Sequence, residues 1–119
     1  MSLDVHLESN GTCQHCGKDS GVRGGEIFWK NITHNLSQMA DQAGIYQHLW
    51  EPQELDITKA NQLIEPLKEG LVRLRAEPDR FKKFNPKNGW GCYEGLIAFV
   101  EDYLKACIEN PGAIVRVIR

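Results

Sequence analysis

Apolar and polar residues alternate at the start of the chain and near its end. Residues 3–8 read Leu-Asp-Val-His-Leu-Glu, and a period of two is typical of a strand with one buried face. A second strand is expected at 26–29, after two glycines, and a third at 113–118, where branched apolar residues dominate. We expect these three segments to pair into a small antiparallel sheet beside the helices.

After the second strand, the spacing of apolar residues changes to that of a helix. Apolar residues recur there every three or four positions in one narrow stripe, at Ile32, Leu36, Met39 and Ala43. This spacing predicts a first helix. Asn31 or Thr33 can supply its N-cap, and Gly44 is expected to end it.

Four further segments have helical patterns. Residues 45–50 predict a short helix that stops before a proline, and residues 78–84 predict one more turn. Residues 56–76 form a long amphipathic pattern that Pro66 should kink or break into two pieces. Residues 90–109 carry apolar side chains over a wide arc, which predicts a deeply buried last helix.

The pattern indicates a single α+β domain. Its length of 119 residues suffices for one core. We expect a mostly helical core of three to five helices over residues 31–110. A ribbon of strand and cysteine turn should precede it at 1–30, and a strand should follow it at 111–119.

Composition excludes several classes of protein. Fourteen basic and sixteen acidic residues give a net charge of −2, so no global field attracts nucleic acid or membrane. The chain lacks a secretory signal pattern and any run of about 18 apolar residues. We therefore expect a cytoplasmic protein with no membrane partner, in which the four cysteines do not form a disulfide framework.

A zinc site is the first chemical hypothesis. Cys13 and Cys16 form a C-x-x-C pair followed by glycine, a sequence typical of a zinc knuckle. His34 is the best third ligand because it opens a predicted helix, and His6 or His15 could be the fourth. On the helical wheel His34 points away from the apolar stripe, so it should be solvated or covered by the N-terminal ribbon. The alternatives are a surface turn with two free thiols and a redox pair.

The other two cysteines lie on the predicted last helix. Cys92 and Cys107 are 15 positions apart, about 22 Å along a straight helix, so they cannot share a metal. Both should be small buried side chains, although Cys92 could also be a reactive thiol. Glu94 is the weak candidate for a general base, on a helix face that is usually only solvated.

Two segments could contact a partner. Trp90 follows Asn88-Gly89 and should lie at a helix N-terminus, where it either meets a partner or covers the core. Residues 73–87 hold six basic and two acidic residues, a local excess of four positive charges. This basic stretch, which includes Lys83, could bind nucleic acid or an acidic protein surface, although such a face is more often solubilising.

Two polar segments carry a resemblance. They read Asn31-Ile32-Thr33-His34-Asn35-Leu36 and Asn85-Pro86-Lys87-Asn88-Gly89-Trp90-Gly91, the second followed by Tyr93-Glu94. Together with residues 39–50 they resemble an unnamed family of short bacterial and phage-encoded proteins of unknown function, over residues 26–119. The resemblance implies no activity. It implies that the two segments belong together, with His34, Asn35, Trp90 and Glu94 as the positions of interest.

Three functions are compatible with the sequence. The first is a non-enzymatic interaction module, an accessory protein of a phage or mobile element, stabilised by Zn²⁺ and binding a protein partner. The second is a small metal-dependent hydrolase in which Cys13, Cys16 and His34 hold the metal and Glu94 acts on water. The third is a metal-free adaptor or nucleic-acid-associated protein that uses the basic stretch, with Asn35, Trp90 and Lys83 as contact residues.

Overall fold

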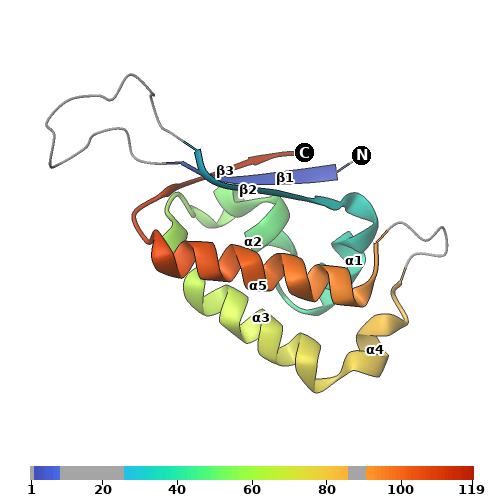
Figure 1. Ribbon diagram of the computed structural model, residues 1–119. Coiled ribbons are helices and arrows are strands. Elements are labelled where there is room, and N and C mark those ends of the chain that lie inside the picture. The colour runs from blue at the N-terminus through green and yellow to red at the C-terminus, as the bar shows by residue number, and fades with distance from the viewer. Residues whose placement is uncertain (1, 9–25, 86–90) are drawn as a thin grey trace, which may run out of the picture.

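A computed structural model describes residues 2–8, 26–85 and 91–119. This part of the chain forms a three-stranded sheet with the helices packed on one of its faces (Figure 1). The predicted α+β class is confirmed.

The sheet joins the two ends of the described chain. Its strands are β1 (Ser2–Glu8), β2 (Glu26–Thr33) and β3 (Ile114–Ile118). The central strand is β1, which pairs antiparallel with both neighbours in the order β2-β1-β3. Leu3, Val5 and Leu7 are fully buried and face the helices, as the alternation of residues 3–8 predicted.

The described residues form five α-helices on one side of the sheet: α1 (Ser37–Gln42), α2 (Tyr46–Trp50), α3 (Ile64–Ala76), α4 (Pro78–Lys82) and α5 (Tyr93–Glu109). Within the described residues, the 3-10 segment η1 (His34–Leu36) lies between β2 and α1, and η2 (Pro52–Leu55) and η3 (Ala60–Gln62) lie between α2 and α3. In Figure 1, α5 lies between the sheet and α3. Tyr103 of α5 is fully buried and stacks on Phe28 of β2, so the last helix has the central position that its apolar arc predicted.

The junction of β2 with the first helix differs from the expectation. β2 continues through Thr33, and Ile32 pairs with Leu3 as part of the sheet. Ile32 is therefore a strand residue, and the helical stripe begins only at Leu36. The longer strand follows from β1, which supplies pairing partners as far as Ser2. Thr33 is the cap, because its Oγ1 accepts the Asn35 N–H at 3.3 Å.

The long helix predicted over 56–76 is divided, as its proline indicated. η3 and α3 are separated at Leu63, and Pro66 is the third residue of α3, where a helix has no use for its missing N–H. The beginning of the predicted helix is wrong, because residues 57–59 lie beside β3. Thr58 accepts the Val115 N–H at 2.9 Å, and Lys59 forms a bridge with Ile114.

Candidate functional site

His34 joins the end of β2 to helix α2. Its Nδ1 accepts the indole N–H of Trp50 at 2.8 Å, and Trp50 is almost completely buried. Tyr46 stacks on Trp50 with 5.5 Å between ring centroids. A shallow hollow of about 390 Å³ lies beside this cluster, lined by Ser37, Gln38, Asp41 and Tyr46. His34 is thus half-buried and accepts a hydrogen bond from a core tryptophan, a contact that the predicted choice between a solvated and a covered side chain did not include.

The hydrogen bond from Trp50 fixes the protonation pattern of His34. An indole N–H can only donate, so Nδ1 must present a lone pair and the proton of the neutral imidazole is on Nε2. Nε2 is buried and has no hydrogen-bond partner among the described residues. In this arrangement neither ring nitrogen offers a lone pair to a metal, so His34 does not fit the role of zinc ligand predicted for it.

The remaining predicted ligands are only partly described. Cys13, Cys16 and His15 lie outside the described residues, so the zinc knuckle stays a prediction. His6 lies on β1 opposite Trp29, and His34 follows Trp29 by five residues, a separation of about 16 Å along the strand. The two imidazoles are too far apart to share one ion. Within residues 2–8, 26–85 and 91–119, no group of three or more histidine, cysteine, aspartate or glutamate residues could hold a metal.

The two segments behind the family resemblance meet in space. Gly91 has a φ of +98°, and a Cβ at this position would lie 2.6 Å from Cγ2 of Thr33. Only glycine allows this backbone to approach Thr33 so closely. Asn85 accepts the Tyr93 N–H at 2.8 Å and so fixes the start of α5. Trp90 lies outside the described residues, and its predicted role stays untested.

The two helical cysteines have different surroundings. Cys107 is fully buried, and burial raises the pKa of its thiol to about 12, which confirms its predicted role in core packing. For Cys92 that prediction is wrong. α5 begins at Tyr93, so Cys92 is its exposed, extended N-cap. Its Sγ accepts the Gly95 N–H at 3.3 Å.

The candidate general base lies on the surface. Glu94 is in the first turn of α5, with a carboxylate oxygen 3.7 Å from Nζ of Lys82 on α4. His34 instead faces Trp50 of α2. Neither contact directs Glu94 toward His34, so the geometry gives the proposed hydrolase no support.

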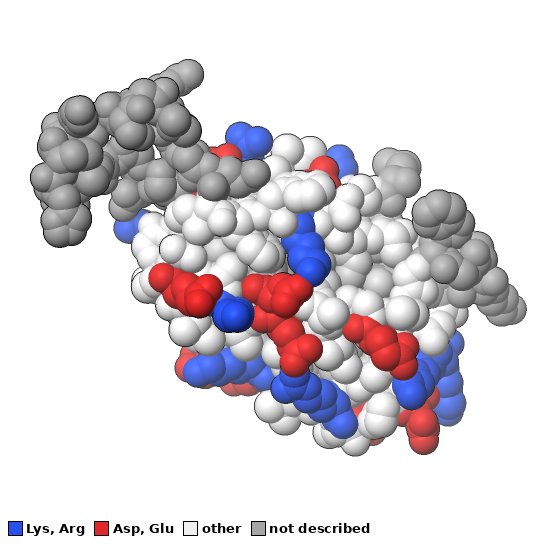
Figure 2. Space-filling view, in the orientation of Figure 1, with Lys and Arg blue, Asp and Glu red and all other residues white. Residues whose placement is uncertain are grey.

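The basic stretch is largely neutralised by acidic neighbours. Four of its six basic residues lie in ion pairs, namely Arg73 with Glu69, Arg75 with Glu101, Arg80 with Glu77, and Lys82 with Glu94. Figure 2 shows acidic and basic side chains intermixed over the helical part of the surface. Lys83 is exposed, and Lys87 lies outside the described residues. The local excess of positive charge therefore does not form a continuous basic patch on the described surface.

A surface that the sequence did not reveal is the face of the sheet opposite the helices. This outer sheet face is formed by alternate residues of the three strands: Asp4, His6 and Glu8 of β1, Ile27, Trp29 and Asn31 of β2, and Ile114, Arg116 and Ile118 of β3. The helices lie on the other side (Figure 1). Ile27, Trp29 and Ile118 remain 43%, 52% and 46% exposed. The alternation of β2 shows this only once the strand is known to reach Thr33.

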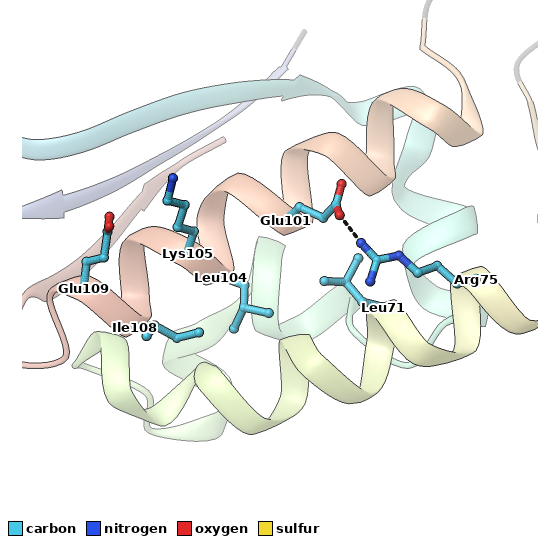
Figure 3. A pocket seen from close by; sticks show the side chains of 7 residues that line it. All are labelled: Leu71, Arg75, Glu101, Leu104, Lys105, Ile108 and Glu109. Atoms are coloured by element: carbon cyan, nitrogen blue, oxygen red, sulfur yellow. Dashed lines mark hydrogen bonds and ion pairs between the residues drawn. The ribbon is translucent and has the colours of Figure 1, made fainter.

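A second apolar surface lies between two helices. An open groove of about 430 Å³ runs along α3 and α5 (Figure 3), with a floor formed by Leu71, Leu104 and Ile108. The ion pair of Arg75 and Glu101 crosses one end, and Lys105 and Glu109 flank the groove. Charges of both signs around it give no preference for a cationic or an anionic partner.

No family model, curated protein or solved structure matches the chain. None of the helices in the described residues is long and apolar enough to cross a membrane.

Proposed function

We propose that this chain is a non-enzymatic interaction module and that it binds a protein through the outer sheet face. The observation that carries the proposal is the exposure of Ile27, Trp29 and Ile118 on a face that no described helix covers. Exposed apolar side chains grouped on one surface mark a site of interaction more often than scattered ones. Tryptophan is enriched among the residues that dominate binding energy.

The charges on this face favour protein over nucleic acid. Asp4 and Glu8 contribute two negative charges, and Arg116 contributes one positive charge, 3.6 Å from Glu8. A phosphate backbone needs an excess of lysine and arginine, whereas this surface is apolar with a slight negative excess. A protein segment with apolar side chains is the better match.

The C-x-x-C pair is part of the same proposal. Cys13 and Cys16 lie in the connection between β1 and β2, where bound zinc would restrain the entry to β2. The support is the spacing of the two cysteines and the glycine after them. A role as an accessory protein of a phage or mobile element is supported by the resemblance over residues 26–119.

Two matched variants test the binding surface. Ile118→Asp places a charge on the outer sheet face, and Ile108→Asp places one in the α3–α5 groove at a residue of similar exposure, 46% against 50%. Tagged wild-type chain and both variants are purified from the native host, each with and without nuclease treatment, and the associated proteins are quantified by mass spectrometry.

We expect the same associated proteins with wild type and with Ile108→Asp. Their amount should fall about tenfold or more with Ile118→Asp, which corresponds to a loss of about 1.4 kcal/mol of binding free energy. Circular dichroism must show that all three proteins fold alike. Equal recovery with both variants would reject the outer sheet face. Loss of the associated proteins on nuclease treatment would favour the nucleic-acid alternative.

A further inference from the structure

The sheet has two edges, and they differ. The outer edge of β3 is covered at its beginning, because Val115 donates to the carbonyl oxygen of Thr58 and Lys59 forms a bridge with Ile114. The other edge is β2, whose only neighbouring strand among the described residues is β1. β2 has eight residues and no proline. Within the described part of the chain, β2 therefore presents an open edge along its length, a row of backbone groups ready to pair with another strand.

We propose that β2 pairs antiparallel with β2 of a second copy of this chain, about a two-fold axis perpendicular to the sheet. The product is a six-stranded sheet with all helices on one face. A two-fold contact uses the same residues of both copies. Because the contact uses β2 of both copies, the assembly closes at two copies, and its outer edges are the two β3 strands, each covered at Ile114 and Val115 by Lys59 and Thr58.

The side chains of β2 suit this pairing. Opposed residues of antiparallel strands point to the same face, so a register that places Trp29 opposite Trp29 of the partner subunit puts Phe28 opposite Lys30 of the partner subunit. The two indoles then cover each other beside the axis, and aromatic pairs across strands are stabilising. In this register Lys30 does not lie opposite Lys30 of the partner subunit.

Lys30 is the residue that could have prevented pairing, because a lysine on an edge strand usually discourages it. Its ammonium group instead forms an ion pair with Asp102 of α5. The charge is turned toward the helical side and is compensated within one copy. The ammonium group of Lys30 therefore does not oppose pairing at the edge of β2.

The helix beneath β2 carries acidic and basic side chains, so the α5 helices of two copies can complement each other in charge. α5 runs below β2 (Figure 1), and Lys105 and Glu109 project from it on the side toward the sheet (Figure 3). Asp102 of the same helix is already paired with Lys30. A two-fold axis at the edge of β2 would bring the two α5 helices toward each other in opposite directions. Because each copy carries both signs there, acidic groups of one can meet basic groups of the other.

Sedimentation velocity on the full chain tests the inference, from about 1 µM to about 1 mM. We expect conversion from monomer to dimer with rising concentration. Trp29→Asp would place like charges opposite each other and should weaken the dimer about tenfold or more. Ile108→Asp in the groove is the matched control and should leave the dimer unchanged. Hydrogen exchange should slow at residues 26–33 as concentration rises, and not at 114–118.

Three results would overturn the inference: a monomer over the whole concentration range, a dimer that Ile108→Asp weakens and Trp29→Asp does not, or growth beyond two copies. The inference is separable from the proposed function, because Ile118 lies on β3, away from the pairing edge. A monomeric chain whose partner is lost with Ile118→Asp would remove the dimer and leave the proposed function standing.

Discussion

At the scale of single residues, the histidine at the end of β2 shows where sequence reasoning stops. The helical wheel indicated that His34 points away from Leu36, and it does not lie in the apolar stripe. What the side chain meets instead depends on where α2 packs, and no local pattern contains that information. Trp50 lies 16 residues further along the chain and donates to His34, so the role of His34 follows from tertiary structure.

Cysteine reactivity gives a prediction at this scale. In a Cys13→Ser/Cys16→Ser background only Cys92 and Cys107 remain. Cys92 is exposed, whereas Cys107 is buried with a pKa near 12, so only about one part in ten thousand of its thiol is ionised at pH 8. Labelling of the native protein with a chromogenic disulfide reagent should therefore give one fast thiol. The second should react only in denaturant.

Removal of the exposed thiol is the control for that experiment. Cys92→Ser in the same background should abolish the fast phase and leave the slow one. Two fast thiols in the native protein would contradict the burial of Cys107.

At the scale of elements, the sequence predicts a strand or helix correctly where one hydrophobic pattern extends over the whole element. The alternation of residues 3–8 and the wide arc of α5 both gave the correct element and its buried side. The errors lie at junctions. Ile32 has helical spacing to Leu36 and also continues the alternation of β2, and pairing with Leu3 decides between the two. The helical pattern of residues 56–76 includes Thr58 and Lys59, because their contact with β3 is long-range and leaves no local signal.

The contact between Gly91 and Thr33 gives a prediction for one such junction. Gly91→Ala should lower the free energy of unfolding by about 2 kcal/mol or more, because the φ of +98° is strained for alanine and its Cβ would lie 2.6 Å from Cγ2 of Thr33. Gly112→Ala is the control, since it has nothing within 4 Å and no positive φ. Urea unfolding measures both.

A second change separates the steric part of this loss from the backbone strain. Thr33→Ser removes Cγ2 and keeps the hydroxyl that caps η1. In the double variant Thr33→Ser/Gly91→Ala, part of the loss should therefore be recovered. Strictly additive losses would show that the two residues do not touch in solution.

At the scale of the whole molecule, the metal hypothesis concerns the connection between two neighbouring strands. We predict about one equivalent of zinc in the purified protein, lost in Cys13→Ser/Cys16→Ser together with part of the thermal stability. His34→Gln should keep the zinc, because the lone pair of Nδ1 is already engaged by Trp50. Elemental analysis and thermal unfolding measure both effects.

His15→Ser is the companion variant and should reduce zinc binding if His15 completes the site. Zinc-free wild-type protein with an unchanged melting temperature would end the metal hypothesis. Loss of zinc with His34→Gln and retention with His15→Ser would restore His34 as a ligand.

The central position of β1 has a consequence for the order in which the fold can form. Strand β1 is synthesised before the helices, yet its pairing partner on one side is residues 114–118. Until those residues leave the ribosome, one side of β1 has no strand to pair with, and its apolar side chains depend on the helices alone. Contacts this distant along the chain slow folding and expose strand edges. A nascent chain that stops before Ile114 should therefore aggregate, even though it contains every helix of the core.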